Sequence, residues 1–141
     1  MKVVNIYIGT DSTSTRNSKK KFGFVLECIL YGTPYTKEEF GEVEGTYNRV
    51  VLAAVNKALE RVKEPCEIHI FAENTYILAM MKNNVSKWAN NGFTTSKGHP
   101  VKNQDEWKEY WILSRKHLIV PQEGKHSYQT WIKEEIERRL S

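Results

Sequence analysis

The chain has 141 residues, of which 40% are hydrophobic and 27% are charged, as is ordinary for a globular protein. This length suits one compact domain and is too short for two ordinary ones, so we expect a single domain over residues 1–141. No apolar run approaches the roughly eighteen residues of a membrane-spanning helix, which excludes that class of protein. The net charge of +4 permits a polyanionic partner without requiring one.

The cysteines and the N-terminus bear on the cellular compartment. Cys28 and Cys66 lie in predicted strands, and their spacing fits no zinc motif. We expect two buried free thiols, which suit a reducing compartment. The N-terminal sequence MKVVNIYIGT lacks the cleavage pattern of a signal peptide and predicts a first strand. We therefore expect a cytoplasmic protein, and a monomer.

The first half of the chain predicts three strands and a helix. The strands, rich in β-branched and aromatic residues, are expected at residues 3–10, 22–31 and near 42–45. Thr46 can cap a helix in which Val51 and Val55 belong to an apolar stripe of helical spacing. Pro65 ends this helix. The strands follow one another closely, which favours an antiparallel meander.

The second half alternates strands and helices. The expected elements are a strand over 66–72, a helix from near Asn74, a helix over 105–114, a strand over 116–120 and a helix capped by Ser127 and ending near Leu140. Residues 85–103 are polar and predict a helix end and a loop. Three antiparallel strands followed by this alternation predict an α/β fold, with a mixed five-stranded sheet flanked by helices on both faces.

Two acidic residues directly follow predicted strands. Asp11 ends the first strand, and Glu73 follows the strand over 66–72. If these strands are parallel neighbours, both carboxylates leave the same edge of the sheet, where converging carboxylates can hold divalent metals for phosphodiester hydrolysis. The alternative is that Glu73 is a first-turn residue that the helix dipole favours.

Several stretches resemble the bacterial type 1 ribonuclease H family along nearly the whole chain. Ile8–Ser12 is similar to the family's first aspartate motif, and Thr46–Val55 is similar to its Thr-Asn-Asn-Arg-Met-Glu-Leu-x-Ala-Ala helix start. Ala72–Tyr76 is similar to Thr-Asp-Ser-Gln-Tyr. Trp88–Phe93 and Pro100–Trp107 resemble a further pair of motifs, and the spacing between the two is kept. The resemblance implies a ribonuclease H-like fold. It also implies four carboxylates that use Mg²⁺ or Mn²⁺ to cut the RNA strand of RNA–DNA hybrids.

The carboxylates of the family carry over only in part. Asp11 matches the first, and Glu73 stands where the family has an aspartate as its third. The second, a glutamate, is replaced by Val51, which belongs to the apolar stripe of its helix. The fourth lies in the last helix, where Glu134 or Glu135 could serve, unless both are solvated residues of a charged helix.

Other positions bear on catalysis and on nucleic-acid binding. His126 resembles a loop histidine that the family uses in proton transfer or product release. The family's basic Lys-Lys-Arg is Ala89-Asn90-Asn91 here, which removes three phosphate-directed charges. The positions that match or lie near family contacts to nucleic acid are Thr46, Asn48, Thr75, Trp88, Lys102 and Asn103.

Two functions of different class follow from these residues. The first is a ribonuclease H-like nucleic-acid-binding protein that recognises an RNA–DNA hybrid or related duplex, with impaired or lost catalysis. The second is an active metal-dependent endonuclease, a hydrolase whose site is rebuilt from Asp11, Glu73 and a glutamate of the last helix. A protein-interaction module without nucleic acid is a third, weaker alternative.

Overall fold

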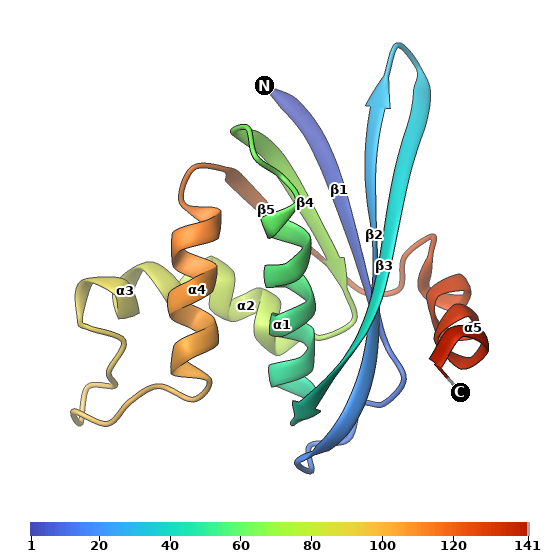
Figure 1. The fold of residues 1–141 in the computed structure, drawn as a ribbon. Helices are drawn as coiled ribbons and strands as arrows, with labels where there is room; N and C mark the ends of the chain where they lie inside the picture. The colour runs from blue at the N-terminus through green and yellow to red at the C-terminus, as the bar shows by residue number, and fades with distance from the viewer. Residues whose placement is uncertain (141) are drawn as a thin grey trace.

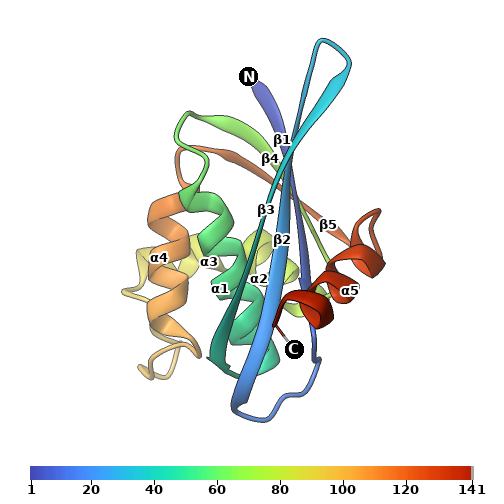
Figure 2. The same ribbon diagram turned by 45° about the vertical axis from the view of Figure 1, so that its right-hand side comes forward.

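The protein forms one mixed sheet with helices on both faces (Figures 1 and 2). The computed structural model describes residues 1–140. In chain order the elements are β1 (Lys2–Thr10), β2 (Ser18–Leu30), β3 (Thr33–Gly45), α1 (Tyr47–Glu60), β4 (Cys66–Ala72), α2 (Thr75–Asn83), α3 (Val85–Asn90), α4 (Gln104–Ser114), β5 (Leu118–Glu123) and α5 (Gln129–Leu140). The strand order is β3-β2-β1-β4-β5. Among these residues, no helix has the length and apolar character needed to cross a membrane.

The pairing of the strands confirms the predicted fold. β1 pairs antiparallel with β2, and β2 pairs antiparallel with β3. β4 lies parallel to β1, with Lys2 beside Cys66 and Tyr7 beside Phe71, and β5 continues the parallel half of the sheet. The carboxyl ends of β1 and β4 therefore meet at one edge of the sheet. Asp11 and Glu73 follow these two strand ends.

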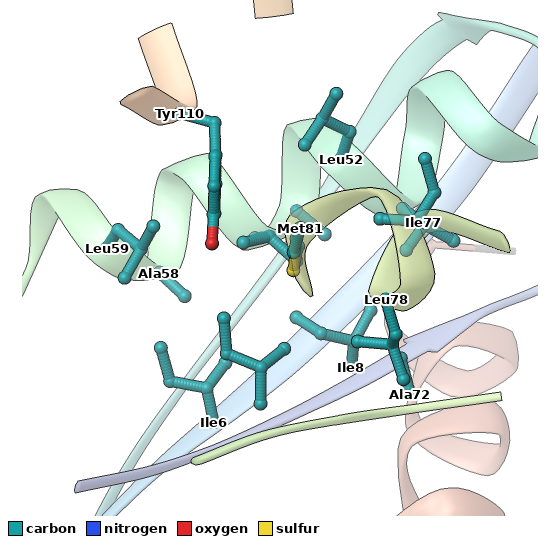
Figure 3. Close-up of a cluster of buried hydrophobic side chains, with 14 of the residues drawn as sticks. Ile6, Ile8, Leu52, Ala58, Leu59, Ala72, Ile77, Leu78, Met81 and Tyr110 are labelled. Carbon is teal, nitrogen blue, oxygen red and sulfur yellow. The ribbon is translucent and has the colours of Figure 1, made fainter. Parts of the chain in front are cut away.

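The main core lies between the sheet and helices α1, α2 and α4 (Figure 1). Figure 3 shows Ile6 and Ile8 of β1 beneath Leu52 of α1 and Met81 of α2. Thr46 caps α1 as predicted, because its side chain accepts a hydrogen bond from the Arg49 N–H. The apolar stripe read from the sequence is thus the face by which α1 packs on the sheet.

The last helix, α5, covers the other face of the sheet (Figure 2). Its Ile132 and Ile136 form a smaller buried cluster with Tyr7 and Val25. The approach is close, because a Cβ at Gly9 of β1 would lie 2.5 Å from Cγ2 of Ile132. A glycine in the central strand thus lets α5 lie directly on the sheet, which brings the helix to the edge that carries Asp11.

Some element boundaries differ from the prediction. β3 extends back to Thr33, well before the predicted start near residue 42. The sequence does not predict its first half, because this half is a polar, exposed edge without alternating apolar residues. β5 runs through Pro121, which an edge strand tolerates. α5 begins at Gln129 rather than just after Ser127, and the Tyr128 carbonyl accepts the Ile132 N–H. Both cysteines are free, but Cys28 is only half-buried.

Candidate functional site

A cleft of about 670 Å³ opens at the carboxyl ends of β1 and β4. Asp11 and Glu73 line it from the sheet edge, Tyr47 and Val51 line it from the start of α1, and Lys133 lines it from α5. The cleft is therefore bounded by three parts of the chain that lie far apart in the sequence. The two acidic residues singled out from the strand ends share this one space.

Both strand-end carboxylates accept hydrogen bonds from the chain itself. The Asp11 Oδ1 accepts the Lys21 N–H at 2.9 Å, and the Asp11 N–H donates to the Lys21 carbonyl at 3.1 Å. The Glu73 Oε1 accepts from Nε2 of Gln129 on α5 at 2.6 Å. Asp11 is thus fixed against β2, whereas Glu73 is tied to the helix on the opposite side of the cleft.

A buried lysine holds the turn that follows Asp11. Lys20 is 1% exposed, and its ammonium group donates to the carbonyls of Arg16 and Gly45 and to the Ser18 hydroxyl. These bonds join the turn to the end of β3, next to the start of α1. The sequence gives no direct signal for this role, because a lysine in a basic, polar segment is ordinarily solvated.

Val51 is 2% exposed and belongs to the main core, although it also lines the floor of the cleft. It stands where the resemblance implies a metal-binding glutamate. The floor of the cleft is therefore apolar at this point. No acidic residue of α1 lies in the lining.

The two candidate glutamates of the last helix point to different places. Glu134 lines the cleft. Glu135 lies outside it and pairs with Arg138 at 2.6 Å and with Arg139 at 2.9 Å, which lowers the pKa of Glu135 to about 2. Glu137, not singled out from the sequence, also lines the cleft, one helical turn beyond Glu134.

His126 anchors the loop between β5 and α5. Its Nε2 lies 2.8 Å from the Ile8 carbonyl, and its Nδ1 accepts the Tyr128 N–H at 3.2 Å. Because the Ile8 carbonyl can only accept and the Tyr128 N–H can only donate, the ring is the neutral Nε2–H tautomer. Burial lowers the pKa of His126, opposed by the bond to Ile8 and the charge of Glu73. His126 lines the cleft as a neutral, fixed group.

Tyr47 lines the cleft but is not among the catalytic residues that the sequence predicts. It is half-buried at the first turn of α1, and burial, followed by the negative charge of Glu73, raises its pKa. The phenol is therefore neutral beside that carboxylate. Its position after the cap residue Thr46 was the only available sequence signal.

The positions matched to nucleic-acid contacts fall into two groups. Thr46, Asn48 and Thr75 lie at the starts of α1 and α2, where the Asn48 Oδ1 accepts from Asn74 Nδ2 at 2.8 Å. Trp88, Lys102 and Asn103 lie around α3 and the start of α4. Trp88 is half-buried and packs edge-on against Trp107 at 5.4 Å, so it also belongs to the core.

The acidic side chains of the cleft do not form a metal centre as arranged. Within residues 1–140, no group of three or more His, Cys, Asp or Glu side chains could hold an ion. Hard divalent cations take about six oxygen ligands. Asp11 and Glu73 already accept hydrogen bonds from the chain, and the neighbouring position on α1 is Val51. The donors present do not fit a divalent metal.

Three comparisons place the chain among known proteins. The ribonuclease H of Acetivibrio thermocellus is 38% identical over 122 residues, which cover 84% of this chain and 79% of that protein. A crystal structure of a type 1 RNase H with the type 2 active-site motif superposes with a TM-score of 0.75 at 17% identity, covering 95% of this chain and 70% of that one. The foamy viral protease-reverse transcriptase in complex with RNA/DNA hybrid gives a TM-score of 0.63 at 19% identity, over 86% of this chain and 17% of that one.

The two structural similarities show the fold alone, whereas the sequence similarities show the family. The sequence model described as RNase H matches residues 1–122, which include β1 to β4, helices α1 to α4 and most of β5. The chain therefore belongs to the RNase H family.

Proposed function

We propose that this chain is a ribonuclease H-like nucleic-acid-binding protein that recognises an RNA–DNA hybrid or a related duplex, with impaired or lost catalysis. Membership of the family supports the class of ligand. The hybrid bound by the foamy viral protein supports the choice of duplex.

The main support for impaired or lost catalysis is Val51, which stands where the family has a metal-binding glutamate. Metal-assisted hydrolysis needs ions held in fixed geometry, with supporting ligands placed to within about 0.5 Å. Val51 offers no donor, and no acidic residue of α1 lines the cleft. Glu73 adds a methylene where the family has an aspartate, so its oxygens move as well. Two of the four expected ligands are thus absent or displaced.

Binding is supported by the polar residues at the starts of α1 and α2. Thr46, Asn48 and Thr75 carry short side chains, and each is next in sequence to Tyr47 or Asn74, which line the cleft. A hybrid duplex presents 2′-hydroxyl groups in a wide and shallow minor groove, which short polar side chains can reach. The net charge of +4 adds a general attraction to phosphates.

The test is a cleavage assay on an RNA–DNA hybrid with Mg²⁺ and with Mn²⁺, beside a binding titration at several salt concentrations. We expect salt-dependent binding with little or no cleavage. Val51→Glu should create or strongly raise cleavage, because it returns a carboxylate to the floor of the cleft. Val51→Gln, of similar size and without charge, is the matched control and should not.

An active endonuclease is the second candidate, because Asp11, Glu73 and Glu134 line one cleft. In that case Mg²⁺ or Mn²⁺ would be required, and the three carboxylates would be its ligands. Wild-type cleavage that disappears with Asp11→Asn would establish this function in place of the first. Absence of any salt-dependent binding to hybrid would contradict both.

A further inference from the structure

Lys133 lies on the face of α5 that looks into the cleft. Gln129 stands on the same face, one helical turn earlier, and its side chain reaches Glu73 at 2.6 Å. Residues four apart in a helix are neighbours on its surface. Lys133 accordingly lines the cleft opposite the sheet edge that carries Asp11 and Glu73.

The charges around the cleft are only partly balanced. With His126 neutral, the charged groups of the lining are the carboxylates of Asp11, Glu73, Glu134 and Glu137 and the ammonium groups of Lys125 and Lys133. Across residues 1–140, neither lysine takes part in an ion pair. The chain therefore brings its own cations into a space whose acidic groups would otherwise need external ones.

We propose that the ammonium group of Lys133, supported by Lys125, is a built-in counter-ion that replaces the divalent metal of this cleft, so that duplex binding there requires no metal. The proposal rests on the proposed function. A lysine is a compact cation on a flexible stem, so it can follow the carboxylates or a duplex phosphate without fixed coordination geometry. Its charge also repels an incoming metal cation.

Three features agree with this assignment. The donors of the cleft do not form a set of three for a metal. Val51 removes the ligand expected from α1. Asp11 accepts a hydrogen bond from the backbone N–H of Lys21, and Glu73 accepts one from the side-chain amide of Gln129, which satisfies part of their charge without an ion. Each of these features weakens the affinity for metal, and the lysines compensate the remaining acidic charge.

The first test measures Mn²⁺ binding by titration calorimetry on the wild-type chain and on Lys133→Glu. We expect no stoichiometric binding to the wild type, so that its Kd lies above the titrated range, and binding to Lys133→Glu at least tenfold tighter than that limit. Lys63→Glu is the control, because it makes the same change in net charge. Lys63 is exposed and lies between α1 and β4, near the end of β4 that is opposite to the cleft. Stoichiometric Mn²⁺ binding by the wild type, or an equal gain in the control, would overturn the proposal.

The second test measures hybrid affinity at constant ionic strength in EDTA and in Mg²⁺. Wild-type affinity should differ less than twofold between the two buffers. Affinity falls as salt rises, and Lys133→Ala should make the slope of log affinity against log salt less steep by about one. Binding that is lost in EDTA would overturn the proposal and leave the proposed function standing. No binding in either buffer would instead contradict the proposed function and the inference that a duplex binds without metal. The Mn²⁺ titrations would then still decide whether Lys133 takes the place of the metal.

Discussion

Val51 and Lys133 line the same cleft, and each makes it less suited to bind a divalent metal. A buried aliphatic side chain stands on its floor, and an ammonium group stands on its α5 wall. A carboxylate at either position would add to the acidic set of Asp11 and Glu73. The Val51→Glu variant keeps Lys133 in the same cleft as the new carboxylate. We therefore expect the double change with Lys133→Glu to bind metal more tightly than either single change.

His126 should make the protein sensitive to acid. The folded chain holds the neutral ring between Ile8 and Tyr128, and burial lowers its pKa below the ordinary 6.5. The unfolded chain then binds protons more readily, so this stabilisation is complete above pH 6.5 and is lost as the pH falls through the lower folded pKa.

The measurement is the urea midpoint of the wild type and of His126→Asn at about pH 7.5 and about pH 5. The wild type should lose more stability on acidification than the variant, whose side chain cannot titrate. His117→Asn is a useful comparison, because burial also lowers the pKa of His117, at a position away from the cleft lining. Equal losses in the wild type and His126→Asn would contradict the role given to His126.

The docking of α5 depends on the fit between Gly9 and Ile132. A Cβ at Gly9 would lie 2.5 Å from Cγ2 of Ile132, so Gly9→Ala should destabilise the protein by about 1–3 kcal/mol. Ile132→Ala removes the clashing methyl group together with buried area and should destabilise it by about 2–5 kcal/mol. The double variant should cost less than the two single effects together, by about 0.5–3 kcal/mol.

Chemical denaturation of the four proteins gives this cycle. Strictly additive effects would mean that the two residues do not meet in solution and that α5 lies further from the sheet. The consequence for function is direct, because α5 carries Gln129 and Lys133 into the cleft. A loosened helix should weaken hybrid binding in proportion to the fraction of molecules in which it has moved.

The elements differ in how far the sequence could predict them. β4 was predicted at its observed bounds, because it is apolar on alternate positions and Pro65 marks its start. β3 was predicted too short, because an exposed edge strand needs no apolar pattern. The phase of α5 was the harder problem. Its two buried isoleucines fix one face, but they do not say which flank meets the sheet edge, so Lys133 was overlooked and Glu134 could not be separated from Glu135.

At the scale of the whole molecule, the residues matched to nucleic-acid contacts propose two surfaces for a duplex, one at the cleft and one at α3 and α4. The second contains Trp88, Lys102 and Asn103, but it lacks the basic triplet of the family. Its Asn90 and Asn91 are exposed, so Asn90→Lys with Asn91→Arg restores two charges without disturbing the core. If this surface contacts the duplex, the variant should bind hybrid more tightly, and the slope of log affinity against log salt should steepen by about two.

The control must separate the place of these charges from their number. Thr33→Lys with Thr36→Lys adds the same two charges to the exposed beginning of β3, at the β2–β3 hairpin, which lies at the opposite end of the sheet from the cleft (Figure 1). Filter binding or fluorescence anisotropy across a salt series would compare the two variants with the wild type. A gain confined to the Asn90 and Asn91 variant would show that the duplex lies along α3 and α4. An equal gain from β3 would show instead that hybrid binding follows the net charge of the whole protein.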